Sequence, residues 1–138
     1  MKFWDSSAIA PLLMSETASE ERENALADDP EIVVWYATKA ELESAICRRL
    51  REESLSMMDA GHARRKLEEL SLSWIEIEPT SLVRERSIRM LRVHPLRTAD
   101  AFQLAAALLA CSDSPAGFHF LTADARLRAA ALKEGLSA

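Results

Sequence analysis

Residues 1–14 read MKFWDSSAIAPLLM, and this stretch decides which fold the rest of the chain is expected to adopt. Phe3 and Trp4 suit a buried strand, yet the next residue is a carboxylate, Asp5. Two small hydroxyl residues then lead into an apolar run with helical spacing. A buried strand that ends on an acid and turns at once into a helix predicts the first unit of an α/β fold.

The same alternation of strand and helix continues along the chain. The expected strands are Lys2–Asp5, Glu31–Tyr36, Trp74–Glu78 and Phe118–Leu121. The expected helices are Ser6–Met14, Thr17–Ala27, Thr38–Arg51, Leu55–Leu72, Thr80–Val93, Thr98–Cys111 and Ala123–Lys133. We expect an interruption near Gly61 and the deepest burial for the apolar helix that starts at Thr98. This order predicts a mostly parallel sheet covered on both faces, with residues 1–138 forming one domain.

Charge and composition exclude several classes of protein. The chain has 17 basic and 22 acidic residues, so it does not coat nucleic acid by bulk charge, although an acidic nuclease site remains open. Cys47 and Cys111 lie in helical patterns and are expected to be reduced thiols of a cytoplasmic protein. The N-terminus does not resemble a signal peptide, and the longest apolar run, Leu104–Cys111, is too short to span a bilayer. We therefore expect no membrane partner.

Four acids lie near the starts of predicted helices. Asp5 follows the first strand, Glu41 lies early in the helix after EIVVWY, Asp100 lies in the first turn of the apolar helix, and Asp124 follows the last strand. Three of these four helices directly follow a strand, and in a parallel sheet those junctions share one edge. The pattern therefore predicts that the carboxylates meet at that edge.

Each acid alone also has an ordinary explanation. First-turn acids complement the helix dipole by about 0.3–1 kcal/mol, and the spacing of Thr38 and Glu41 is that of a capping box. Thr98 and Thr122 suit N-cap positions followed by an Asp. Carboxylates about 4 Å apart, however, repel by roughly 4 kcal/mol at an effective dielectric of 20, which exceeds any helix-end gain. A gathered cluster thus predicts a divalent cation, Mg²⁺ or Mn²⁺, and such a site suits phosphodiester hydrolysis.

The segments DSSA, TKAELESA, LRTADAFQLAAAL and FLTADARL, in that order, resemble the motifs of PIN-domain ribonucleases. They are most similar to the small VapC-type toxins of toxin–antitoxin pairs, and the resemblance covers nearly the whole chain. It implies a single PIN-like nuclease domain, a three-layer α/β/α sandwich with a mostly parallel sheet of four to five strands. Relatives form the fifth, edge strand beyond the final Gly-Leu, and it is expected to be missing or vestigial here.

The resemblance also implies residue roles and partners. The catalytic and metal-binding acids would be Asp5, Glu41, Asp100 and Asp124, with Asp5 and Asp100 as the main ligands of Mg²⁺ or Mn²⁺. The supporting polar residues would be Ser6, Ser7 and Thr122. The implied function is a metal-dependent endoribonuclease, the toxin of a type II toxin–antitoxin system. RNA would be its substrate, a small antitoxin its partner, and a homodimer its assembly.

Two alternatives remain open at this point. A receiver-like Mg²⁺-binding phospho-signalling domain has a similar sheet, but it needs a second acid beside Asp5 and an Asp at the end of a middle strand, which WIEIEPT does not offer. A catalytically inactive PIN scaffold used for binding is the other, and the presence of all four acids argues against it.

Other charged and apolar residues carry weaker expectations. Arg97 precedes the apolar helix and could contact a phosphate, although surface arginines are common. The basic residues late in the helix Thr38–Arg51, including Arg48, are explained by the helix dipole alone. Glu43 lies about 200° around that helix from Glu41, so it is expected in solvent. Met57 and Met58 are expected to be core residues rather than a binding stripe.

Overall fold

Four short strands form one parallel sheet at the centre of the molecule. In the computed structural model, which describes residues 1–138, these are β1 (Lys2–Trp4), β2 (Ile32–Trp35), β3 (Ile75–Ile77) and β4 (His119–Leu121). Their order is β3-β2-β1-β4, and every pair is parallel. The order reverses beside β1, so the crevice where such sheets bind ligands lies at the carboxyl ends of β1 and β4. The predicted α/β fold with a parallel sheet is confirmed.

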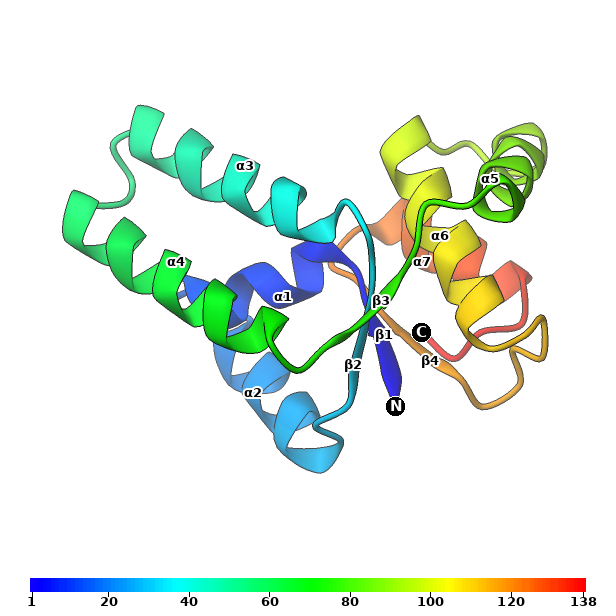
Figure 1. Ribbon diagram of the computed structural model, residues 1–138, viewed down its shortest axis with the longest axis horizontal. Coiled ribbons are helices and arrows are strands. Elements are labelled where there is room, and N and C mark those ends of the chain that lie inside the picture. The colour runs from blue at the N-terminus through cyan, green and yellow to red at the C-terminus, as the bar shows by residue number, and fades with distance from the viewer.

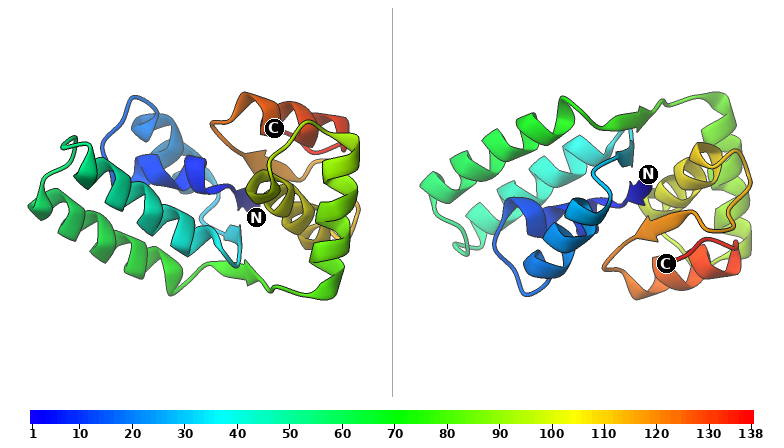
Figure 2. Two further views of the ribbon diagram at one scale, coloured as in Figure 1. Left: turned by 90° about the horizontal axis from the view of Figure 1, so that it is seen from above. Right: turned by 90° about the horizontal axis from the view of Figure 1, so that it is seen from below.

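Seven helices cover the two faces of this sheet. They are α1 (Ser6–Leu13), α2 (Ser19–Asp28), α3 (Thr38–Arg51), α4 (Met57–Ser71), α5 (Ser81–Val93), α6 (Thr98–Ala110) and α7 (Ala125–Lys133). Helices α1 to α4 lie on one side and α5 to α7 on the other, which makes the sheet the middle of three layers (Figures 1 and 2). Helices α3 and α4 form a hairpin that projects away from the sheet. None of these helices has the length and apolar character that a membrane crossing needs.

Alternate strand residues supply two apolar cores, one on each face of the sheet. Phe3, Val33 and Phe120 pack with α5, α6 and α7, where the rings of Phe3 and Phe120 stack with centroids 5.4 Å apart. Trp4 and Val34 point the other way and pack with α1, α3 and α4. Helix α6 contributes the most buried residues of any helix, as its apolar sequence predicts. Burial on both faces fixes the strand register and hence the positions of the strand ends.

Two expectations about α4 are wrong. The helix is not interrupted at Gly61, because glycine costs a helix only about 1 kcal/mol and α4 regains more by packing on α1 and α3. Met57 and Met58 are not core residues: they lie in the first turn of α4 and are 76% and 73% exposed.

The end of the chain adds one rung to the sheet rather than a strand. Gly135 has a φ of 89° and ends α7, as expected for a helix stop. The chain then returns beside β4, where Ser137 forms an isolated parallel bridge with His119. The backbone N–H of Phe120 donates to the Ser137 carbonyl at 2.7 Å. The fifth strand is therefore vestigial.

Candidate active site

Asp5 lies directly after β1 and is buried beneath the site. Its backbone N–H donates to the Leu121 carbonyl of β4 at 3.0 Å, which extends the strand pairing up to the acid. Asp5 occupies the N-cap position of α1, but its side chain makes no capping hydrogen bond. The carboxylate instead accepts from the hydroxyls of Ser7 and Thr122, the latter at 2.9 Å, and the residue is only 5% exposed.

The turn after β4 is held against α1 by the same two hydroxyls. Ser7 Oγ accepts from the backbone N–H of Ala123 at 2.9 Å, and Thr122 Oγ1 accepts from that of Asp124 at 3.0 Å. Asp124 Oδ1 accepts from the Leu127 N–H at 2.8 Å and so caps α7. The predicted supporting residues Ser7 and Thr122 thus join Asp5 and Asp124, the first and last of the four predicted site acids.

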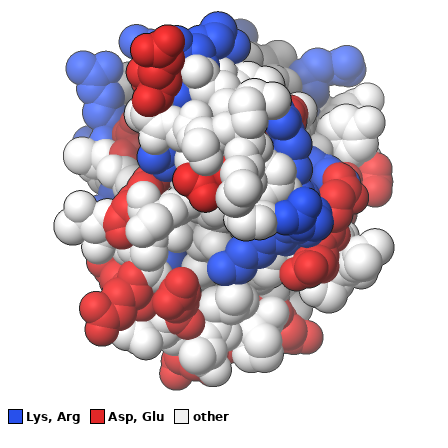
Figure 3. All heavy atoms as spheres, turned by 90° about the vertical axis from the view of Figure 1, so that its left-hand side faces the viewer, with Lys and Arg blue, Asp and Glu red and all other residues white.

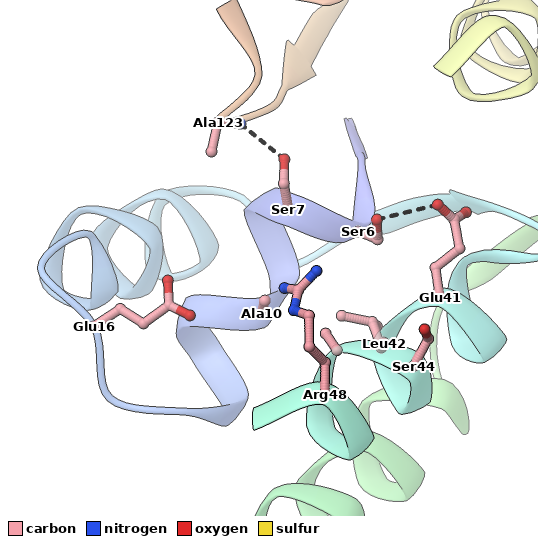
Figure 4. A pocket seen from close by; sticks show the side chains of 10 residues that line it. Ser6, Ser7, Ala10, Glu16, Glu41, Leu42, Ser44, Arg48 and Ala123 are labelled. Atoms are coloured by element: carbon pink, nitrogen blue, oxygen red, sulfur yellow. Dashed lines mark hydrogen bonds between the residues drawn. The ribbon is translucent and has the colours of Figure 1, made fainter. Parts of the chain in front are cut away.

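Glu41 reaches the site from α3, and its carboxylate is held from two sides. Gln103 Nε2 of α6 donates to Oε1 at 2.8 Å, and Ser6 Oγ donates to Oε2 at 3.4 Å (Figure 4). The expected capping box with Thr38 is wrong, since Ala37 is the N-cap and Thr38 is already helical. The Thr38 hydroxyl accepts from Gln103 at 3.1 Å instead. Helix capping therefore does not explain Glu41.

Asp100 lies half-buried in the first turn of α6. The N-cap of α6 is Arg97, not Thr98 as expected, and it makes no side-chain capping bond. The N-cap of α7 is Asp124 rather than Thr122. Of the four predicted acids, only Asp124 caps a helix with its side chain, while Glu41 and Asp100 lie in first turns, where they also complement the helix dipole.

The pKa shifts of Glu41 and Asp100 include the charges of neighbouring carboxylates. Burial raises the pKa of Asp5, against the opposing effect of its hydroxyl donors. Burial, then the charge of Asp5, raises the pKa of Glu41 to about 7, although the hydrogen bond from Gln103 acts to lower it. Burial, then the charges of Asp124 and Asp5, raises the pKa of Asp100. The structure thus brings together acids from four distant segments.

The donor set fits a hard divalent cation, although the carboxylates are not arranged as a finished metal site. No three acidic, histidine or cysteine side chains form a cluster of metal-binding geometry. Asp5 and Glu41 are instead bonded to protein donors, as described above. Four oxygen-donor side chains with no histidine, cysteine or lysine among them suit Mg²⁺ or Mn²⁺ rather than zinc. A bound cation would lower the raised pKa values of Asp5, Glu41 and Asp100.

Two cavities meet over these acids and form one open cleft. The smaller, about 470 Å³, lies between α1 and α3 and has Ser6 and Ser7 in its wall (Figure 4). The larger, about 980 Å³, is lined by Asp100 and Asp124. The two cavities share three residues of α3, which are Glu41, Ser44 and Arg48. Arg97 and Arg126 line the larger cavity, so a phosphate entering there would meet positive charge beside the acids.

Gln103 and Arg48 belong to the site but were not predicted. Gln103 is fully buried, and its sequence signal is the single amide in AFQLAAALLA, three residues after Asp100. Arg48 lies seven residues after Glu41 and therefore on the same face of α3, a spacing that could have revealed it. It was missed because the helix dipole alone explains a basic residue near the C-terminus of α3.

A parallel sheet with carboxylates beyond its switch point defines an α/β domain with an acidic site. The family model of the PIN domain matches residues 2–133, and the chain therefore belongs to the PIN domain family. PIN domains are generally nucleases, which supports a hydrolase. A comparison with curated proteins finds no significant match.

Proposed function

We propose that the protein is a metal-dependent endoribonuclease. The observation that carries the proposal is the buried Asp5 carboxylate, placed at the switch point of the sheet and close enough to Glu41 and Asp100 to shift their pKa values. The stabilisation that these acids give to helix ends is smaller than the repulsion between their charges. A bound cation would offset that repulsion, which gives a reason for keeping the acids together.

Each acid of the site has a proposed role in binding the cation. Asp5 and Asp100 would hold Mg²⁺ or Mn²⁺, with Asp124 and Glu41 completing the set directly or through water. The bound cation would polarise the phosphate and activate water for attack on the phosphodiester. Gln103 and Ser6 hold the Glu41 carboxyl group in position beside the other acids.

The finer proposal is that this nuclease is the toxin of a type II toxin–antitoxin system. Its support is the resemblance of four segments, in order, to VapC-type toxins. A small antitoxin protein, a second copy of the chain and a cytoplasmic location follow from the same resemblance. The receiver-like alternative gains nothing from the structure, because the chain after β3 passes through Glu78 and Pro79 and offers no Asp to phosphorylate.

Cleavage of RNA by the purified protein tests the enzymatic proposal. Wild type should cut total cellular RNA at internal sites with Mg²⁺ or Mn²⁺ and should stop when EDTA is added. Asp100→Asn should lose at least about 100-fold of this activity. Asp59→Asn, an exposed first-turn acid of α4 outside the cleft, is the matched control and should cut normally. Equal cleavage by Asp100→Asn and wild type would refute the proposed site.

Growth tests the toxin proposal separately. Induction of the wild type should arrest growth, and Asp100→Asn should not. Co-expression of the small open reading frame next to the gene should restore growth, and its product should co-purify with the protein. If the wild type cuts RNA but neither arrests growth nor binds such a partner, the nuclease proposal stands and the toxin proposal is refuted.

A further inference from the structure

One face of α3 runs along the whole cleft. Glu41, Ser44 and Arg48 follow at helical spacing, and all three line both cavities. Figure 4 shows the Arg48 side chain rising from α3 into the smaller cavity, with its guanidinium near Ala10 of α1. The helix thus places a positive charge about two turns from the carboxylate of Glu41.

Arg48 differs from Arg49 and Arg64 because no side chain or carbonyl of the protein binds its guanidinium. It makes no hydrogen bond or ion pair, although Glu16 and Glu41 line the same cavity. Arg49, the next residue, donates to the Ser54 hydroxyl at 3.3 Å and to the Ser54 carbonyl at 3.2 Å. Arg64 is paired with Glu43 at 2.7 Å. Arg48 is also the only basic residue among the ten that line the smaller cavity.

An unpaired guanidinium in this position would offset the repulsion between the acidic site and a nucleic acid. A cluster of carboxylates repels the phosphates of an approaching nucleic acid, so the substrate needs local positive charge beside the acids. Figure 3 shows basic and acidic side chains interspersed on the face at the free end of the α3–α4 hairpin, not one broad basic field. The basic residues that line the two cavities are Arg48, Arg97 and Arg126, and a guanidinium fork matches phosphate oxygens.

We propose that Arg48, with the Ser44 hydroxyl, binds a substrate phosphate adjacent to the one that is cut. This inference rests on the proposed nuclease function. The RNA strand then crosses the face of α3 that carries Glu41, Ser44 and Arg48. The phosphate that is cut lies over the acids, and the adjacent phosphate lies in the smaller cavity. Arg97 and Arg126 lie in the larger cavity, on the far side of Glu41, and would meet the strand as it leaves.

Binding of a short fluorescent single-stranded RNA, measured by anisotropy in the uncleaving Asp100→Asn background, tests the proposal. Arg48→Ala should weaken binding about tenfold and reduce the slope of log K against log salt by about 0.7, the value for one lost contact to a single strand. Arg51→Ala is the control, because Arg51 is exposed on the same helix, has no partner and lines neither cavity. Equal effects of the two substitutions would overturn the proposal.

A substrate series locates the phosphate. Single linkages of the RNA are replaced by uncharged methylphosphonates, each with a 2′-O-methyl group on the preceding nucleotide to keep it intact. At one position next to the cut site, Arg48→Ala should no longer weaken binding; an equal penalty at every position would overturn the proposal. Binding that depends on Arg48 without cleavage by the wild type would refute the proposed function alone, and absence of binding by the wild type would refute both.

Discussion

The two faces of α3 carry their charges in opposite arrangements. On the face toward α4, Lys39 pairs with Glu68 at 3.0 Å and Glu43 pairs with Arg64 at 2.7 Å. On the face toward α1 and α6, Glu41 lies beside other carboxylates and has only neutral donors. Glu43, expected in solvent, is therefore an ion-pair residue, although only two positions separate it from Glu41.

The difference separates the parts of α3 that serve stability from those that serve chemistry. Exposed ion pairs cost little and contribute little, so the outer face is nearly neutral for folding. The inner face, which carries Glu41, is unfavourable because burial and the charges of Asp5 and Asp100 raise the pKa of this acid. An arrangement that opposes folding is retained where function needs it. Substitutions on the two faces should therefore have opposite consequences.

The largest effect is expected at Asp5, which is buried beneath the site. Asp5→Asn keeps an oxygen that can accept from Ser7 and Thr122, so the local structure should persist. Removal of the charge should lower RNA cleavage by about 10³-fold, because a main cation ligand is lost. The rate of cleavage under Mg²⁺, with Asp59→Asn as control, gives the measurement. Cleavage within a few-fold of wild type would mean that Asp5 is not a catalytic residue.

Gln103→Leu should give the next largest effect, roughly 10- to 100-fold in cleavage, because the amide that orients Glu41 is lost. Gln103 lowers the pKa of Glu41, so its loss should also move the pH–rate profile to higher pH. Leucine removes a buried amide oxygen that has no partner, which should limit the loss of stability. Ser87→Ala, a buried polar change on α5, should leave the pH profile in place. An unshifted profile for Gln103→Leu would contradict the orienting role.

Much of the fold could be predicted because its signals are local. Strand β2 is four buried β-branched or aromatic residues, and helices α3 and α6 show their apolar spacing directly. Because the carboxyl ends of parallel strands meet at one edge of a sheet, the positions of Asp5 and Asp124 after their strands predicted that they lie near each other. The interruption expected at Gly61 was wrong because tertiary packing decides whether a helix tolerates a glycine.

The fine structure of the site could not be predicted, because its partners are far apart in the chain. Thr38 and Glu41 have the spacing of a capping box in the sequence. In the structure, both side chains instead accept hydrogen bonds from Gln103, which is more than 60 residues away. The Thr122 hydroxyl reaches Asp5 across 117 positions. Such contacts depend on how α6 packs against α3 and how β4 pairs with β1, and no local pattern encodes them.

Stability offers a sharper test of the inner face. The pKa of Glu41 is raised to about 7, so the folded state binds its proton more tightly than the unfolded chain does, and stability falls as pH rises from about 4.5 to 7. Glu41→Gln removes this loss and should stabilise the fold at pH 8 by about 1 kcal/mol, allowing for solvent screening, with little change at pH 4. Urea unfolding at both pH values gives the measurement. Destabilisation at pH 8 would contradict the unfavourable inner face.

The smallest effect is expected on the outer face, two residues further along α3. Glu43→Gln removes an exposed ion pair with Arg64, so the melting temperature should fall by no more than about 1 °C and RNA cleavage should not change. Arg64→Gln, alone and combined with Glu43→Gln, closes a double-mutant cycle that isolates the pair. The sign is what matters, because Glu41→Gln should stabilise at pH 8 while Glu43→Gln should not. A loss of cleavage in Glu43→Gln would mean that both faces of α3 serve the reaction.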